Sequence, residues 1–209
     1  NGFDPDDFPK KLEPPPTDRF VVSYVGTVFR LTSPTGFLGA VRRLHRTEPE
    51  LAKLLEVRFI GRVVDLEAAA FEGTEQLGVR RLGYMDHEEA LRSLGSSHLA
   101  LCILDEAPGV ERIYPAKIFE LMHLGRPTLT LTPDGALARL VEKHHVGDRL
   151  PPRDEEAIAA YLASKLRAFR DGKLPAGGEV MRGRGIEQFD RRTIAGKFAA
   201  VMRTAIGRR

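Results

Sequence analysis

The sequence has few of the residues that would place it in a specialised structural class. It has one cysteine, Cys102, so no internal disulfide can form, and we expect this side chain to be a small buried core residue. It has no tryptophan, and its aromatic residues are not interleaved with basic ones as they are on nucleic-acid-binding surfaces. No uncharged apolar run is long enough to span a bilayer. We therefore exclude a disulfide-stapled domain and a transmembrane protein, and we expect no nucleic-acid partner.

Several signatures of catalysis and binding are also missing. The six histidines show no metal-ligand spacing, and there is no Gly-x-Ser-x-Gly elbow, Asp-x-Asp motif or Gly-x-Gly-x-x-Gly loop after a strand. The first residues have neither the basic start nor the apolar core of a signal peptide. We accordingly expect a cytoplasmic protein that needs no metal or other cofactor.

Charge is nearly balanced over the whole chain, at +3, but it is not evenly distributed. From Met181 to Arg209 there are eight Lys or Arg residues and two Asp or Glu residues. This excess favours a solvated helix face. Peripheral contact with anionic lipid is the alternative.

Hydrophobic periodicity alternates between the two patterns that are typical of buried strands and of amphipathic helices. We expect strands at residues 20–26, 56–61, 78–83, 98–104 and 128–131, and helices at residues 34–44, 64–76, 86–94, 115–124, 135–145 and 154–169. This order predicts an α/β fold, a doubly wound, Rossmann-like parallel sheet with helices on both faces. Ligands bind at the carboxyl ends of the strands in such sheets.

The chain divides into three segments. Residues 1–19 are rich in Pro and Asp and predict a linker, residues 20–175 contain the sheet, and residues 176–209 predict a helical extension. The extension carries an apolar stripe at helical spacing, formed by Ile194, Phe198, Val201, Met202 and Ala205. We expect this stripe to dock on the domain or on a neighbour, including a second copy.

The stretch "YPAKIFELMHLGRPTLTL", residues 114–131, contains the most informative spacing. Pro115 suits the first turn of a helix, whose free N–H groups attract phosphate, and Lys117 adds a full positive charge there. Glu120 lies three residues on, and its two oxygens can accept both hydroxyls of a ribose. This spacing indicates a nucleoside diphosphate site. A surface Lys–Glu pair is the alternative, and the spacing by itself does not separate the two.

Four stretches resemble the C-terminal, donor-binding domain of the family-4 retaining glycosyltransferases, which have the two-domain GT-B architecture. They are "NGFDPDDFP", "FVVSYVG…PTGFLGAVRRL", "RRLGYMDHEEALRSLGSSHLALCIL" and "YPAKIFELMHLGRPTLTLTPDGALARLVEKHHVG". The last resembles the family's Pro-x-Lys-x-x-Glu donor block and is the most specific. The resemblance implies one half of a GT-B fold that binds a sugar nucleotide, most often of uridine or guanosine.

The resemblance also implies roles for individual residues. Glu120 would hold the ribose, and the diphosphate would lie against Gly26, Thr27, Pro115, Ala116 and Lys117. Gly83, Tyr84 and Met85 would lie against the base. Arg30, or Arg62 after the second strand, would supply a cation in a loop where many members have an Arg and a Lys.

The sequence departs from the family pattern at the sugar end of the site. Many members have two glutamates spaced Glu-x7-Glu, and the first of these positions is Arg112 here, with Glu111 one residue out of register. Thr27 and Thr32 stand where many members have the cations of the first loop. We keep Arg30, Lys117 and Glu111 as the candidate catalytic residues.

Together these features predict a glycosyltransferase donor domain that is incomplete without an N-terminal domain, which would bring a glycan or lipid-linked acceptor. Two alternatives stay open: a non-catalytic nucleotide-binding module, which the altered residues favour, and a sugar-nucleotide epimerase of the same architecture. An epimerase needs an acid–base carboxylate near the sugar, where this chain has Arg112.

Overall fold

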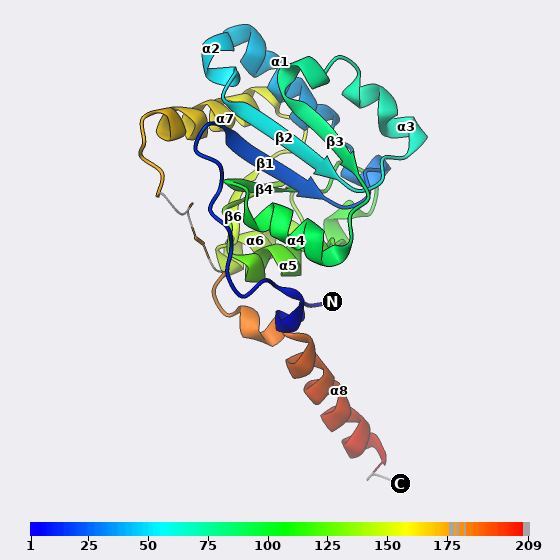
Figure 1. The fold of residues 1–209 in the computed structure, drawn as a ribbon. Helices are drawn as coiled ribbons and strands as arrows, with labels where there is room; N and C mark the ends of the chain where they lie inside the picture. Colours follow the sequence, from blue (N-terminus) through cyan, green and yellow to red (C-terminus); the bar gives the residue numbers. More distant parts are fainter. Residues whose placement is uncertain (176–177, 179, 182, 207–209) are drawn as a thin grey trace.

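The fold is a six-stranded parallel sheet with helices on both faces, as seen in a computed structural model (Figure 1). The structure describes residues 1–175, 178, 180–181 and 183–206. The strands lie in the order β3-β2-β1-β4-β5-β6. They are β1 (Phe20–Val25), β2 (Leu55–Ile60), β3 (Val79–Gly83), β4 (Leu99–Ile103), β5 (Thr128–Leu131) and β6 (Gly147–Leu150). The predicted Rossmann-like fold class is confirmed.

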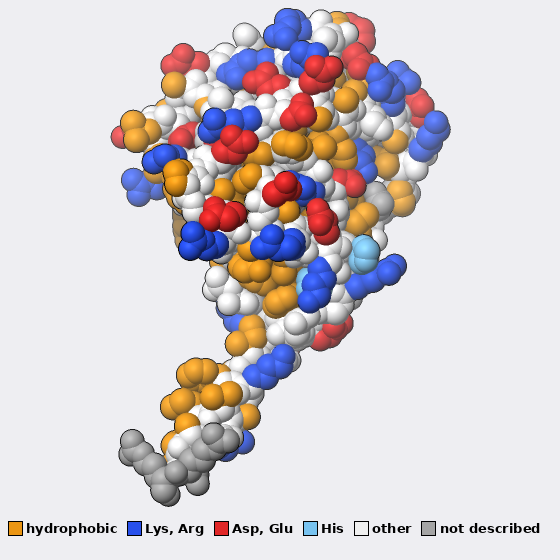
Figure 2. Space-filling model, turned by 180° about the vertical axis from the view of Figure 1, so that it is seen from behind, with side chains coloured by type: hydrophobic (Ala, Val, Ile, Leu, Met, Phe, Trp, Pro, Cys, Tyr) orange, Lys and Arg blue, Asp and Glu red, His pale blue; other side chains and the backbone are white. Residues whose placement is uncertain are grey.

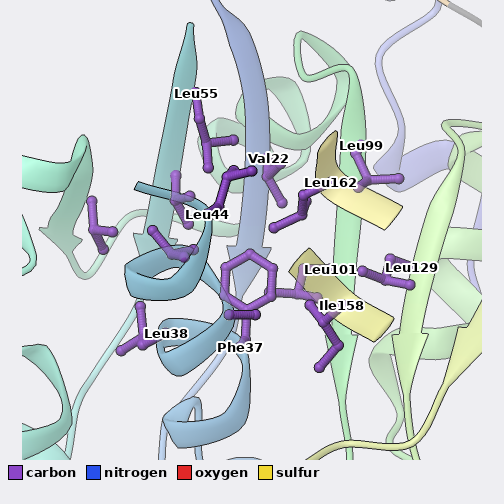
Figure 3. Packing of buried hydrophobic residues seen from close by; sticks show 14 of the residues in the cluster. Val22, Phe37, Leu38, Leu44, Leu55, Leu99, Leu101, Leu129, Ile158 and Leu162 are labelled. Atoms are coloured by element: carbon purple, nitrogen blue, oxygen red, sulfur yellow. The ribbon is translucent and has the colours of Figure 1, made fainter. Parts of the chain in front are cut away.

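Two apolar clusters join the helices to the two faces of the sheet. One face packs against α1 (Thr35–Thr47), α2 (Pro49–Ala52) and α7 (Glu155–Arg170), and Figure 3 shows Phe37, Leu44 and Ile158 directed towards strand residues such as Val22 and Leu101. The other face packs against α4 (His87–Gly95), α5 (Lys117–Leu124) and α6 (Ala136–His144). The four inner strands, β1, β2, β4 and β5, are buried on both faces, which explains why they have nearly continuous apolar runs in the sequence.

The structure corrects two expectations about secondary structure. The helix predicted over residues 64–76 is α3 (Asp65–Ala68) followed by separate 3-10 turns at Ala69–Phe71 and Glu75–Leu77, because Gly73 takes a positive φ and interrupts it. The sequence pattern also missed β6, whose polar residues pair with β5 in register from Thr128↔Gly147 onward. An edge strand of this kind has no apolar run to reveal it.

The N-terminal segment packs against the body of the domain. It contains a 3-10 turn at Pro5–Asp7, and Phe3 is buried against α5, where it stacks on His123 with ring centroids 4.3 Å apart. Phe3 also forms a parallel bridge with Asp190, just after the 3-10 turn Ile186–Phe189. The chain therefore enters the domain beside the point where its last helix leaves it.

The last helix, α8 (Arg191–Ile206), projects away from the domain (Figure 1). Within this helix no side chain is buried, and Phe198, Val201 and Ile206 are each about two-thirds exposed. Figure 2 shows the resulting apolar surface along the projecting segment. The helical extension is thus present, but beyond Ile194, which is partly buried near Gly2, its apolar stripe does not dock on the domain. Arg182, Arg208 and Arg209 of the basic tail lie outside the described residues.

Candidate nucleotide-binding site

The loops after β1, β2 and β3 begin at Gly26, Gly61 and Gly83, and they lie together at one edge of the sheet. The N–H of Gly26 donates to the carbonyl of Ile60, and the N–H of Gly61 donates to the carbonyl of Gly83. All three take positive φ values, and a Cβ on Gly61 would lie 2.5 Å from the carbonyl oxygen of Gly26. At Gly61 glycine is required because the two loops approach too closely for a side chain, and at Gly26 and Gly83 the positive φ favours it.

Lys117 lies against the first of these loops. Its Nζ is buried and has no hydrogen-bond partner among the described residues. The ammonium lies 3.8 Å from the centroid of the Tyr24 ring, and a Cβ on Gly26 would come within 2.3 Å of it. Burial lowers the pKa of Lys117 to about 8. A buried ammonium without an acceptor is costly, so this position is suited to binding an anion.

The start of α5 adds backbone donors beside this ammonium. The helix begins at Lys117, and Pro115 and Ala116 lie immediately before it rather than inside it. The N–H groups of Ile118 and Phe119 already donate to the carbonyls of Pro115 and Ala116. The N–H groups of Ala116 and Lys117 therefore head the helix, where its dipole favours a negative charge.

Glu120 lies on the same helix but faces a different neighbour from Lys117. Its carboxylate is partly buried, 3.9 Å from Nε2 of His87 at the start of α4, and His87 in turn lies 3.7 Å from Asp7. Burial raises the pKa of Glu120, and among the described residues none donates a hydrogen bond to it. Since α4 starts just after β3, this carboxylate lies at the carboxyl edge of the sheet, with acceptor capacity to spare.

Gly83 and Tyr84, which were expected near the base, lie at the end of β3, and Arg62, which was expected as a cation, follows β2. Arg62, Gly83 and Tyr84 line one surface hollow, and Tyr84 is almost fully exposed. Met85 follows at partial exposure. Among the residues that the structure describes, no hydrogen bond or ion pair links this hollow to Lys117, so the two parts of the site are related by their shared sheet edge.

The loop after β1 is held by hydrogen bonds from hydroxyl groups rather than by Lys or Arg side chains. The carbonyl of Thr27 accepts from the hydroxyls of Tyr24, at 3.0 Å, and Thr32, at 2.8 Å. Arg30 is exposed at the start of the 3-10 turn Arg30–Thr32. Tyr24 and Thr32 thus shape the loop. Sequence reasoning did not assign Tyr24 a role, although a phenol in the apolar run just before Gly26 was a signal.

The sugar end of the site has one displaced carboxylate. Glu111 and Arg112 lie in the 3-10 turn Val110–Arg112 and pair with each other at 3.1 Å. A hydrogen bond to backbone N–H and the neighbouring Arg112 lower the pKa of Glu111, so it is ionised at neutral pH. The backbone of Glu111 lies against Gly135, where a Cβ would come within 2.7 Å of its Cα. Glu111 is therefore held at the strand-end edge, with its side chain turned to Arg112.

Within the described parts of the chain, no group of three His, Cys, Asp or Glu residues is placed to hold a metal ion. The same residues contain no helix that is long and apolar enough to cross a membrane.

Comparison with solved structures places this fold among GT-B glycosyltransferases. The lipopolysaccharide outer core galactosyltransferase WaaB matches 98% of this chain with a TM-score of 0.61 and 16% identity. Sucrose-phosphate synthase from Thermosynechococcus elongatus matches 100% with a TM-score of 0.63 and 19% identity. Anabaena Alr3699/HepE, solved in complex with UDP and glucose, matches 97% with a TM-score of 0.63 and 18% identity.

This chain spans about half the length of these structures, covering 54%, 52% and 55% of them. No family model and no curated protein matches it. At these identities the likeness establishes the fold, a Rossmann-like half of a GT-B architecture.

Proposed function

We propose that this chain is the donor-binding domain of a retaining glycosyltransferase of the family-4 type. It would bind a nucleoside diphosphate sugar, from which the sugar passes to an acceptor hydroxyl with its anomeric configuration kept. The observation that carries the proposal is the buried Lys117 ammonium beside Gly26 and the start of α5, which has no hydrogen-bond acceptor in the described part of the chain. A diphosphate would supply the missing negative charge.

Glu120 would bind the ribose of the same nucleotide. Its carboxylate is one helical turn from Lys117 and has unfilled acceptor sites at the sheet edge. A ribose presents two adjacent hydroxyls that one carboxylate can accept together. Gly83, Tyr84 and Met85 would then lie against the base, with Arg62 as a further cation nearby. The surface hollow that Arg62, Gly83 and Tyr84 line supports this placement.

The transfer step would depend on stabilising the leaving diphosphate, which gains negative charge as the glycosidic bond breaks. Lys117 and the start of α5, together with Arg30 from the loop after β1, would stabilise that charge. The proposed reaction would therefore need no metal or other cofactor. Glu111 would contact the sugar if its side chain turned away from Arg112. Retention is what the resemblance implies, and the anomeric configuration of the product tests it.

The donor assignment is tested by calorimetric titration of the 209-residue chain with UDP, GDP, uridine and guanosine. We expect one diphosphate to bind more tightly than its nucleoside, because the phosphates meet Lys117. Glu120→Ala should weaken the diphosphate and its nucleoside alike, whereas Lys117→Met should weaken the diphosphate alone. Glu50→Ala and Lys53→Met, an exposed ion pair in the α2 region, are the matched controls. Equal binding by all four variants would refute the assignment.

The acceptor would be a glycan or lipid-linked acceptor held by an N-terminal domain, and we propose that this chain alone binds donor without turnover. The neighbours support this, since each is about twice the length of this chain. Incubation of the isolated chain with UDP-sugars and glycan acceptors should give no product. Glycosyl transfer by the isolated chain would contradict the proposal.

We also propose a cytoplasmic protein with peripheral contact to anionic lipid. The support is the composition of α8, which has four Lys or Arg residues and no Asp or Glu. Sedimentation with phosphatidylserine vesicles, but not with phosphatidylcholine vesicles, would bear this out.

A second candidate, a nucleotide-binding module without catalytic activity, is favoured by one observation. Arg112 occupies the place of the first family glutamate and holds Glu111 in an ion pair. The test is to assemble the chain with its acceptor domain and to measure glycosyl transfer. No transfer by the wild-type chain, together with transfer by the Arg112→Glu variant, would favour this second function.

A further inference from the structure

We infer that Tyr24 is a positioning residue for the donor phosphates. Its ring holds the ammonium of Lys117, and its hydroxyl holds the loop that follows β1. The inference rests on the proposed function, because it concerns the same phosphate site. Tyr24 would set the geometry of that site from within β1, without touching the nucleotide itself.

The ring is the main partner that the structure provides for the Lys117 ammonium. Tyr24 is fully buried on β1, and its ring centroid lies 3.8 Å from Nζ. Among the described residues, that nitrogen has no hydrogen-bond acceptor. A cation over an aromatic face is attracted by the ring quadrupole, most strongly where water is excluded. The ring therefore keeps the ammonium beside Gly26, the position that a phosphate would approach.

The hydroxyl of the same residue fixes the other side of that position. It donates to the carbonyl of Thr27 at 3.0 Å, and the hydroxyl of Thr32 donates to the same oxygen. Burial raises the pKa of the Tyr24 phenol, so it stays a neutral donor across the physiological range. Tyr24 thus sets the distance between the loop and the ammonium, which is the width available to the diphosphate.

Packing by itself does not require a tyrosine at this position. The Tyr24 ring packs against Phe59, with centroids 5.4 Å apart, inside an apolar cluster that a phenylalanine would also fill. A phenylalanine would keep the ring under Lys117 and lose the loop bond, whereas a leucine would lose both. The two substitutions therefore separate the ring from the hydroxyl.

The experiment measures affinity for UDP and uridine, or for GDP and guanosine if the base is guanine, in the full 209-residue chain. We expect Tyr24→Phe to lower diphosphate affinity by about threefold and Tyr24→Leu by about tenfold or more. The nucleoside, which carries no phosphate, should keep its affinity in both variants. Tyr161→Leu, which removes a tyrosine from α7, is the matched control and should change neither ligand.

A double-mutant cycle distinguishes positioning from general loosening of the structure. In a Lys117→Met background, Tyr24→Leu should no longer change the preference for diphosphate over nucleoside. An undiminished preference in Tyr24→Leu, or the same loss with and without Lys117, would overturn the inference while leaving the proposed function intact. Failure of the wild-type chain to bind either diphosphate would overturn both.

A measurement on the unmutated protein covers the case in which Tyr24→Leu does not fold. Protons above an aromatic ring resonate upfield, so the ε-methylene of Lys117 should be displaced upfield in the NMR spectrum, and Lys117→Met identifies the signal. Addition of UDP or GDP should move it as the ammonium turns to the phosphates. A signal at the ordinary lysine position would overturn the inference.

Discussion

At the residue scale, burial of the Lys117 ammonium in the proposed phosphate site lowers the stability of the fold. The pKa of Lys117 is lowered from 10.5 to about 8, so between these values the unfolded chain binds more protons than the folded one. The free energy of unfolding should therefore rise as pH increases from 8 to 10.5. Below pH 8 the folded chain bears the full cost of a buried charge.

Replacing this residue should stabilise the fold. We expect Lys117→Met to raise the free energy of unfolding at pH 7 by up to about 3 kcal/mol, because the thioether packs on Tyr24 without a charge. Urea unfolding at pH 7 and pH 10 measures this, with exposed Lys53→Met as control. If Lys117→Met were less stable than wild type at pH 7, burial of the ammonium would not destabilise the fold.

The two charged residues also predict the pH dependence of nucleotide binding. Burial raises the pKa of Glu120, so its carboxylate loses charge at a higher pH than usual, while Lys117 loses its charge above about 8. Affinity should be greatest between these limits and fall on both sides. Glu120→Gln should flatten the acid side, and Lys117→Met should flatten the alkaline side. Ionisation of the nucleotide itself is common to all variants, so unchanged profiles would contradict both roles.

At the scale of elements, the strands were the most predictable part of the molecule. The strand at 128–131 was predicted with its observed bounds, and four others within a residue or two. For the four inner strands the reason is burial on both faces, which leaves a continuous apolar run, whereas the mostly exposed β3 was marked by its flanking glycines. The helix after β2 was less predictable, since its alanines and glutamates suit a helix while Gly73 ends it. Helix α5 begins two residues later than expected, which moves Pro115 outside it.

Arg126 ties together elements that sequence patterns could not relate. Its side chain is fully buried between α5 and β5, and it donates to the carbonyls of Gly95 and Glu13. We expect Arg126→Met to lower the free energy of unfolding by about 2–4 kcal/mol, because these carbonyls would lose a charged donor. Urea unfolding measures this, with exposed Arg46→Met as control. A loss below about 0.5 kcal/mol would mean that water replaces the guanidinium.

Helix α8 should contribute little to the stability of this chain. Changing Phe198 and Val201 to serine should leave the thermal midpoint within about 2 °C of wild type, because both side chains are exposed. The same change should reduce any concentration-dependent association seen by sedimentation velocity. A midpoint several degrees lower would show that this stripe packs on the domain in solution.

At the scale of the whole molecule, sequence gave the architecture more completely than the site. Alternating apolar patterns and the donor block predicted the parallel sheet and a half of a GT-B fold. Sequence patterns could not show that Lys117 is buried over Tyr24 or that Glu120 faces His87. They also could not show that Phe3 pairs with Asp190, the residue before α8. Each of these contacts joins residues far apart in the chain, and their geometry depends on loop conformations that no spacing rule specifies.

The most direct measurement is a crystal structure of this chain with the tighter-binding diphosphate, UDP or GDP. We expect phosphate oxygens within about 3.2 Å of Lys117 Nζ and of the N–H groups that head α5. We also expect both ribose hydroxyls to donate to the Glu120 carboxylate. A nucleotide bound elsewhere, or one bound here with Glu120 turned away from the ribose, would contradict it.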